Sequence, residues 1–230
     1  MAMVECRRLR KIYRQGKLEV VALDGIDLAI GKGEFAALAG PSGSGKTTLL
    51  NLIGGLDRPD AGEIRLQNQL LNDLDQSQLA ELRLRQIGFV FQSFNLIPVL
   101  TALENVEFIL LLQGVAAGER RERARTILDD VGLQGLHGRR PAELSGGQQQ
   151  RVAVARAIAS DPAIVLADEP TANLDSKTGQ GLLELMKEMN EKKQVTFIFS
   201  THDRMVMDYA RRLILLHDGR IAEDRAKAGK

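Results

Sequence analysis

The glycine-rich segment at residues 40–47, Gly-Pro-Ser-Gly-Ser-Gly-Lys-Thr, constrains the fold more strongly than any other part of the chain. An apolar run at residues 35–39 precedes it, and a helical pattern at residues 48–53 follows it. Its glycines let successive backbone N–H groups curl around a phosphate group, and the start of the next helix adds positive potential. A strand, such a loop and a helix together form a P-loop. The segment therefore predicts an α/β domain with an anion cradle at the end of a strand.

The last residues of this loop have side chains suited to a magnesium-bound nucleotide. Lys46 can reach the terminal phosphates, and the Thr47 hydroxyl can ligate Mg²⁺. The alternative is a Gly- and Ser-rich turn with a surface lysine, and the flanking strand and helix argue against it. We therefore predict ATP and Mg²⁺ as ligands, with a catalytic role for Lys46 and nucleotide contacts from Gly40, Ser42, Gly43, Ser44, Gly45, Lys46, Thr47 and Thr48.

The hydrophobic patterns predict two kinds of strand. Apolar and polar residues alternate at residues 20–30 and again at 61–66, which is typical of half-exposed antiparallel strands. Four other runs are apolar throughout, which is typical of parallel strands buried on both faces. Helical patterns separate these runs, so the predicted class is α/β. The four runs are Glu34 to Ala39, Ile87 to Phe91, Ala163 to Ala167 and Val195 to Phe199.

The middle of the chain differs, because no comparable strand occurs between Gln92 and Ser145. Residues 102–112 and 119–131 have helical patterns instead. We predict a RecA-like P-loop NTPase fold with a mostly parallel sheet core, an N-terminal antiparallel β-subdomain, and a helical subdomain inserted at approximately residues 93–160. Residues 222–230 are predicted to form a frayed, solvated end.

Composition excludes several classes of protein. Lys and Arg number 31 against 30 Asp and Glu, and the net charge of +1 gives no overall field for nucleic acid. Aromatic residues make up only 4% with no Trp, so a base-stacking platform is not expected either. No secretory signal precedes the first strand, and no apolar run approaches the roughly 18 residues that span a bilayer. We expect a cytosolic chain that reaches a membrane only through a partner.

Asp168 and Glu169 are two acids at the end of the apolar strand at residues 164–167. Burial near an apolar strand penalises charge unless a positive group lies close by. Magnesium phosphate would supply it: Asp168 would hold Mg²⁺, and Glu169 would orient and deprotonate the attacking water. The alternative is a polar turn that ends the strand, and the presence of the P-loop makes it the weaker interpretation.

A second anion-binding geometry occurs at Ser145, Gly146, Gly147 and Gln148, directly before a helical pattern. Taken alone, Ser145 would be an ordinary N-cap. Separately, Gly40, Gln92, Asp168 and His202 each follow an apolar strand. The carboxyl ends of parallel strands form the ligand crevice of open α/β sheets, so we expect these four residues to converge.

These motifs, in this order along the chain, resemble the ABC ATPase family: the P-loop, residues 144–148, 167–170 and 173–175, and His202. The resemblance covers nearly all of residues 1–230 and implies a single ABC ATPase domain. In that family the Ser-Gly-Gly turn contacts the γ-phosphate held by the opposite subunit's P-loop. The resemblance thus implies a dimer of two copies around two ATP molecules.

The resemblance also implies roles for residues whose own signals are weak. It assigns Tyr13 to adenine stacking, Gln92 to Mg²⁺ and the attacking water, His202 to the γ-phosphate, and Asp175 to communication across the dimer. Without the resemblance, Tyr13 would be a packing residue and Gln92 a polar turn residue.

Residues 88–98, 100–106, 54–57 and 166–171 are similar to the branch with lipoprotein-release (Lol-type) and macrolide-export (Mac-type) ATPases. This similarity implies a separate permease with a large extracytoplasmic domain, and a location at the cytoplasmic face of the inner membrane. Ile109 and Ala172 stand where members of the branch commonly have Pro and Gly, whereas Gln149 and Gln150 favour the Mac-type over the Lol-type pattern. Together these residues leave the two alternatives open.

Two alternatives compete with a transport ATPase. An ABC ATPase acting on nucleic acid or ribosomes would usually carry a coiled-coil insertion or a second ATPase half, and neither is evident. A nucleotide-dependent switch without productive turnover is the other, and the presence of Glu169 argues against it.

Overall fold

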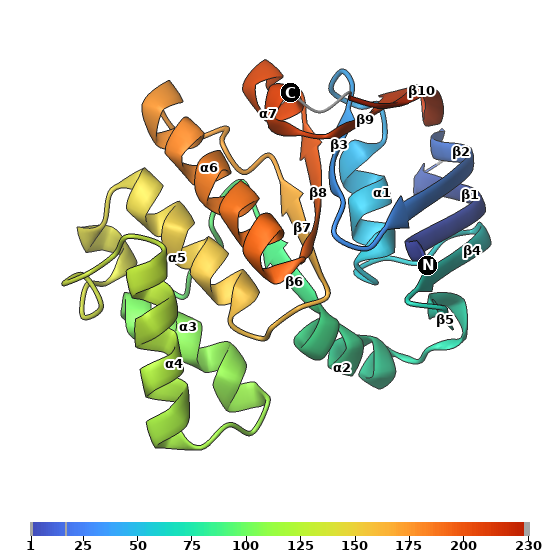
Figure 1. Cartoon of the computed structure of the whole chain (residues 1–230). Coiled ribbons are helices and arrows are strands. Elements are labelled where there is room, and N and C mark those ends of the chain that lie inside the picture. The colour runs from blue at the N-terminus through green and yellow to red at the C-terminus, as the bar shows by residue number, and fades with distance from the viewer. Residues whose placement is uncertain (1, 17, 228–230) are drawn as a thin grey trace.

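The computed structural model describes residues 2–16 and 18–227, which form two sheets and several helices (Figure 1). The smaller sheet has the order β2-β1-β4-β5 and is antiparallel throughout. This confirms the predicted antiparallel strands near the N-terminus. Its strands are β1 (Ala2–Gln15), β2 (Leu18–Gly31), β4 (Ala61–Leu66) and β5 (Gln69–Leu70).

The larger sheet has six strands in the order β10-β9-β3-β8-β7-β6. All neighbours are parallel except β10, which pairs antiparallel with β9. The four buried apolar runs of the sequence are β3, β6, β7 and β8, as predicted. The strands are β3 (Phe35–Ala39), β6 (Ile87–Val90), β7 (Ile164–Asp168), β8 (Thr196–Thr201), β9 (Arg212–His217) and β10 (Arg220–Ala226).

The prediction of a frayed end at residues 222–230 was wrong for residues 222–226, which lie in β10. Arg212 on β9 holds this strand, because its guanidinium donates to both carboxylate oxygens of Asp224 at 2.8 and 2.7 Å. The charged composition reflects an edge strand with both faces mostly exposed, since edge strands commonly carry charge. Residues 228–230 lie outside the described residues.

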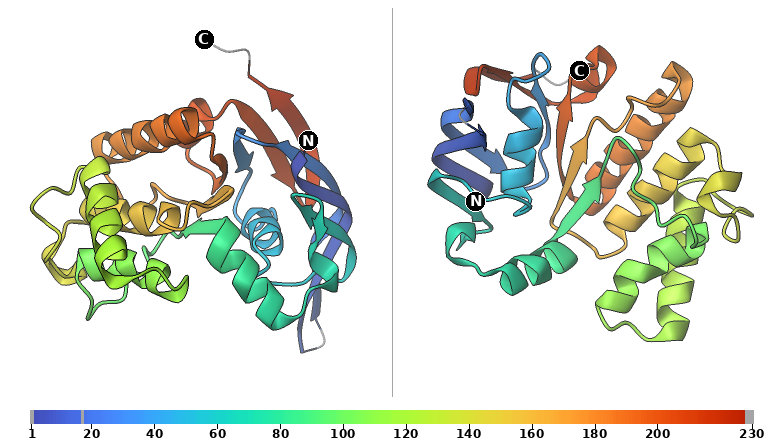
Figure 2. Two further views of the ribbon diagram at one scale, coloured as in Figure 1. Left: turned by 60° about the horizontal axis from the view of Figure 1, so that its bottom comes forward. Right: turned by 180° about the vertical axis from the view of Figure 1, so that it is seen from behind.

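Helices cover both faces of the larger sheet (Figure 2). On β3, alternate side chains enter two cores: Phe35 and Ala37 face one, and Ala36 and Leu38 face the other. The second core also contains α1 and the smaller sheet, so α1 lies between the two sheets. The helices are α1 (Lys46–Ile53), α2 (Gln76–Gln86), α3 (Ala102–Leu112), α4 (Ala117–Asp130), α5 (Gly146–Ile158), α6 (Ser176–Lys193) and α7 (Arg204–Tyr209), with 3₁₀ turns η1 (Leu71–Asp73) and η2 (Pro141–Glu143).

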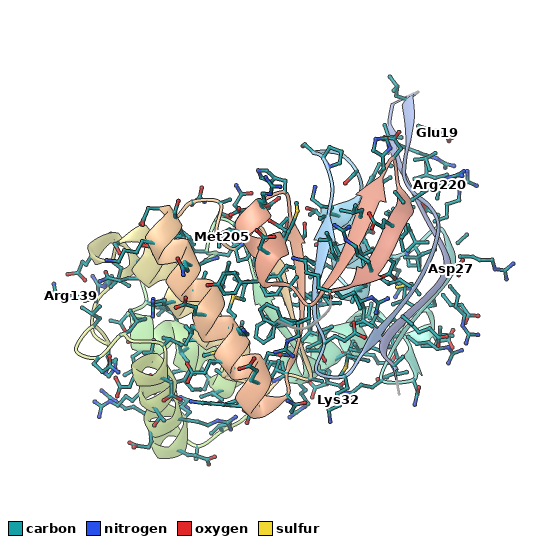
Figure 3. The ribbon with its side chains drawn as sticks, turned by 45° about the horizontal axis from the view of Figure 1, so that its top comes forward. Glu19, Asp27, Lys32, Arg139, Met205 and Arg220 are labelled. Carbon is teal, nitrogen blue, oxygen red and sulfur yellow. The ribbon has the colours of Figure 1, made fainter. Side chains whose placement is uncertain are left out.

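The helices α3, α4 and α5 pack together at one end of the molecule, where Arg139 lies, and Asp27 marks the antiparallel sheet at the other end (Figure 3). The predicted helix at residues 102–112 is α3, whose start is set by a capping box between Thr101 and Glu104. The extent of the helical subdomain, approximately residues 93–160, stays a prediction. None of the described helices is both long and apolar enough to cross a bilayer.

Gly88 on β6 is required by the close approach of α5. A Cβ at this position would lie 2.3 Å from the carbonyl oxygen of Ala157. We expect Gly88→Ala to lower the free energy of unfolding by about 2 kcal/mol, because overpacking a core commonly costs about 1–3 kcal/mol. Chemical denaturation measures this. The control is Gly118→Ala on α4, where nothing lies within 4 Å, and equal stability of the two variants would contradict the argument.

Candidate functional site

The loop between β3 and α1 has no spare room behind it. At Gly40, φ is 150° and a Cβ would lie 2.2 Å from the carbonyl oxygen of Leu216 on β9. At Gly45, φ is 101° and a Cβ would lie 2.6 Å from the carbonyl oxygen of Ala22 on β2. Only glycine accepts both the conformation and the contacts. The predicted cradle is therefore braced by β2 of the smaller sheet and β9 of the larger sheet.

Two polar groups in this loop are suited to bind phosphate oxygens. Lys46 is 7% exposed, and its ammonium donates to the carbonyl oxygens of Gly40 and Pro41 at 2.8 and 2.9 Å. The buried Ser44 hydroxyl has no hydrogen-bond partner among the described residues. An unpaired buried polar group costs free energy, which a ligand oxygen would recover. The other predicted contacts, Ser42, Gly43 and Thr48, lie in the same loop and the first turn of α1.

Thr47 and Asp168 come together, although 120 residues separate them in the chain. The Thr47 hydroxyl lies 3.0 and 3.2 Å from the two carboxylate oxygens of Asp168. Asp168 is the last residue of β7 and pairs with Ser200 on β8, which places its carboxylate at the carboxyl edge of the sheet. Hydroxyl and carboxylate oxygens are the ligands that Mg²⁺ prefers. The pair could hold a magnesium ion between them.

Glu169 has the left-handed backbone conformation, with φ of 46°, and its N–H donates to the Ser200 carbonyl at 2.9 Å. Its carboxylate contacts His202 Nδ1 at 2.6 Å and accepts from the Thr201 hydroxyl at 3.2 Å. The Glu169 side chain is 14% exposed and the imidazole 69% exposed. The structure thus joins two predicted catalytic residues and adds Thr201, a residue that no sequence pattern indicates.

Gln92 follows β6 by two residues, and β6 pairs with β7 so that Val90 lies opposite Ala167. Its backbone therefore lies at the same sheet edge as Asp168. Its carbonyl oxygen accepts from Asn173 Nδ2 at 2.8 Å. The side chain is exposed and makes no hydrogen bond to the described residues, so the structure does not bring this amide to Asp168 or Glu169. Its predicted role stays a prediction.

Ser145 is the N-cap of α5, as the alternative interpretation of that turn proposed. It forms a capping box with Gln148: the serine hydroxyl accepts from Gln148 N at 3.3 Å, and the glutamine side chain accepts from Ser145 N at 2.9 Å. Gly147 is forced to be small, since a Cβ would lie 2.2 Å from the Thr178 methyl group. A cap does not conflict with anion binding, because other N–H groups of the first turn remain without helical partners.

Asp175 is the N-cap of α6 and accepts from the N–H groups of Lys177 and Thr178, both at 3.1 Å. The hydrogen bond from the Thr178 hydroxyl, followed by those from the backbone, holds the pKa of Asp175 below its usual range. Thr178 also contacts Gly147, so Asp175 lies next to the Ser145 turn. The roles of both motifs at a dimer interface stay predictions.

Tyr13 lies on β1 and is 41% exposed. Its hydroxyl donates to Asp57 at 2.9 Å, and the ammonium of Lys11 lies 5.2 Å from its ring centroid. Burial and the bond to Asp57 raise the pKa of Tyr13, and a hydrogen bond with Thr48 opposes them. The ring is thus held near the first turn of α1. Sequence reasoning gave Lys11 and Asp57 no role at the site, because Lys11 belongs to no recognisable pattern and Asp57 entered only through the branch similarity at residues 54–57.

Comparison with known proteins agrees with this geometry. The family model described as ABC transporter matches residues 23–172. The chain is 46% identical over 222 residues to the lipoprotein-releasing system ATP-binding protein LolD of Chromohalobacter salexigens, covering 96% of this chain and 94% of that protein. It is also 46% identical over 231 residues to the macrolide export ATP-binding/permease protein MacB of Syntrophobacter fumaroxidans, covering 100% of this chain and 32% of that protein.

A solved structure shares the complete fold. It is a dimeric ATP-binding cassette in a post-hydrolysis state bound to ADP and Pi, with a TM-score of 0.92 and 46% identity, and the match covers 99% of this chain and 100% of that one. The predicted P-loop NTPase fold and the resemblance to the Lol-type and Mac-type branch are confirmed. The chain therefore belongs to the ABC transporter family, as an ATP-binding subunit that hydrolyses ATP.

Proposed function

We propose that the loop at residues 40–47 and the Asp168–Glu169 pair bind MgATP and hydrolyse it to power a membrane permease. The observation that carries this proposal is the meeting of three groups at one sheet edge. Lys46 is buried in the cradle, Thr47 contacts Asp168, and Glu169 contacts His202. Each group suits a different part of phosphoryl transfer, and no purely structural role requires all of them together.

The residues divide the chemistry between binding and proton transfer. Lys46 exchanges the carbonyls of its own loop for phosphate oxygens, and the cradle N–H groups hold the remaining oxygens. As water attacks the γ-phosphorus and the bond to the bridging oxygen breaks, Glu169 accepts a proton from that water. His202 and Thr201 orient the Glu169 carboxylate through the contacts already present. His202 also reaches the γ-phosphate from its exposed position.

Mg²⁺ fits the donor set of the site. Thr47 and Asp168 present hydroxyl and carboxylate oxygens to one point, and Gln92 could add an amide oxygen from the neighbouring strand end. When bound, the ion would neutralise charge on the terminal phosphates.

We propose that two copies of the chain share two ATP molecules. Each copy has one cradle and one Ser145–Gln148 turn, and the turn lies at the N-terminus of the 13-residue helix α5. A γ-phosphate from a second copy would bind the N–H groups of this turn, where the helix potential is positive. The similar solved cassette is dimeric and holds ADP and Pi, which supports this arrangement.

The permease would dock on an apolar groove of about 460 Å³ between α2, β6 and α3. Apolar side chains near it are unusually exposed: Leu112 is 54% exposed and Leu111 is 50% exposed. Exposed apolar patches commonly mark protein interfaces. From the lipoprotein-releasing and macrolide-export names of relatives, we propose an integral membrane permease with an extracytoplasmic domain, and a location at the cytoplasmic face of the inner membrane. The groove is lined by Leu56, Phe89, Ile97, Phe108, Ile109 and Leu112, among others.

The test is purification of the tagged chain from detergent-solubilised membranes, with identification of what accompanies it. We expect an integral membrane protein with an extracytoplasmic domain, and we expect Leu112→Asp to lower its recovery about tenfold or more, as for loss of an interface anchor. Leu18→Asp is the control, since Leu18 is 69% exposed on the β1–β2 hairpin, away from α3. Recovery of DNA or ribosomes instead would favour the non-transport alternative.

A further inference from the structure

The segment at residues 91–95, which carries Gln92, has a strained backbone. Phe94 has φ of 60° and Asn95 has φ of 48°, two successive left-handed residues without glycine. Such conformations raise the free energy of residues other than glycine and persist only where surrounding groups impose them. Within the segment, Phe94 N donates to Phe91 O at 3.1 Å and Asn95 N donates to Ser93 O at 2.6 Å. These local bonds leave most carbonyl oxygens of the segment free to accept from elsewhere.

Three side chains from other elements donate to four carbonyl oxygens of the segment, one of which, that of Phe91, also accepts from Phe94 N. Gln150 on α5, fully buried, donates to Phe91 O at 3.5 Å and to Pro170 O at 2.7 Å. Asn173, in the loop after β7, donates to Gln92 O at 2.8 Å. The third is Arg156 on α5, which donates to Asn95 O at 2.5 Å and to Phe94 O at 2.9 Å. The segment is therefore bound to both α5 and the loop that follows Glu169.

The guanidinium of Arg156 is an unusual group for this position. Burial lowers the pKa of Arg156, and no carboxylate of the described residues lies within ion-pair distance of it. Arg156 is half-buried, and among the described residues its guanidinium donates hydrogen bonds to the main-chain carbonyl oxygens of Phe94 and Asn95. Desolvating a charge without a counter-charge is costly, so the two left-handed residues and the arginine depend on one another.

We infer that Arg156 is a positioning residue for hydrolysis, acting together with Gln150 and Asn173. It holds the strained segment at residues 91–95 in place and thereby sets the position of Gln92. This inference rests on the proposed role of Gln92 at the magnesium and attacking water. The Phe94 ring also lies beside the Ser145 turn, since its Cζ would be 3.8 Å from a Cβ placed on Gly146. A shift of α5 would therefore be carried to Gln92.

The test compares Arg156→Met with Arg151→Met in the purified chain. Arg151 lies on the same helix and also donates to a backbone carbonyl, that of Val131 at 2.7 Å, but it does not contact the segment. We expect Arg156→Met to lower kcat for ATP about 30-fold with KM for ATP changed less than threefold, because small misplacement of a catalytic group costs up to about 100-fold. Arg156→Lys, which keeps a charged donor, should recover part of this loss. Equal effects of Arg156→Met and Arg151→Met would overturn the inference.

A double-mutant cycle with Gln92→Ala separates positioning from mere stability. If Arg156 acts through Gln92, Arg156→Met has little further effect on kcat in the Gln92→Ala chain, whereas independent effects would multiply. Multiplying effects overturn the inference but leave the proposed function intact. An unchanged kcat for Gln92→Ala alone contradicts the proposed role of Gln92. Asn173→Ala, which removes one hydrogen bond, repeats the test if Arg156→Met does not fold, with the same expected non-additivity.

Discussion

Replacing Glu169 by Gln is expected to lower kcat by about 10³-fold, because general-base catalysis contributes about 10²–10⁴-fold. The amide keeps the shape of the carboxylate and can still bond Thr201, but it cannot accept a proton from the attacking water. Steady-state phosphate release measures the rate. Glu119→Gln is the matched control, since Glu119 is an exposed residue at the start of α4. Equal rates for wild type and Glu169→Gln would show that the base lies elsewhere.

The Glu169→Gln variant should also stabilise a dimer that holds ATP. Since Glu169 acts on the chemical step, its loss leaves ATP bound without turnover, and bound ligand stabilises whichever state holds it. We expect Glu169→Gln to change from monomer to dimer in light scattering when MgATP is added, and to stay monomeric with MgADP. A variant that binds ATP but remains monomeric would contradict the shared-site arrangement while leaving the assignment of the base untouched.

Lys46→Ala is expected to weaken ATP binding by about 10- to 100-fold. Charge-assisted hydrogen bonds contribute about 1.5–3 kcal/mol, and the buried ammonium is the side-chain cation at the centre of the cradle. Titration calorimetry measures the dissociation constant. Lys32→Ala is the control, because Lys32 is exposed in the turn between β2 and β3 (Figure 3). Unchanged affinity for ATP in Lys46→Ala would count against the cradle.

The two variants differ in the step they affect. Loss of Lys46 removes an interaction made in both ground state and transition state, so it raises KM as well as lowering kcat/KM. Loss of Glu169 removes one made only in the transition state, so it lowers kcat with little change in binding. Because Lys46 also satisfies the carbonyls of Gly40 and Pro41, thermal unfolding of Lys46→Ala without nucleotide must accompany the calorimetry.

The sequence by itself determined the features that depend on neighbouring residues. The loop at residues 40–47 needs a preceding strand, its own glycines and a following helix, all within 20 residues. Likewise the four buried strands appear as apolar runs, and α3 begins where Thr101 and Glu104 can cap it. Convergence of Asp168 and His202 at one edge could be predicted too, because parallel strands always present their carboxyl ends together.

Only the tertiary structure decided the features that depend on partners far along the chain. Residues 222–226 form a strand because β9 offers backbone groups and Arg212 offers a counter-charge to Asp224. The sequence around Arg156 predicts a helix but no partner for its guanidinium. The partners are the carbonyl oxygens of Phe94 and Asn95, which Arg156 reaches only because α5 packs on β6. The physical reason is that the spacing of apolar residues along the sequence indicates which face of a helix or strand is buried. Hydrogen bonds and ion pairs depend instead on which other element covers that face.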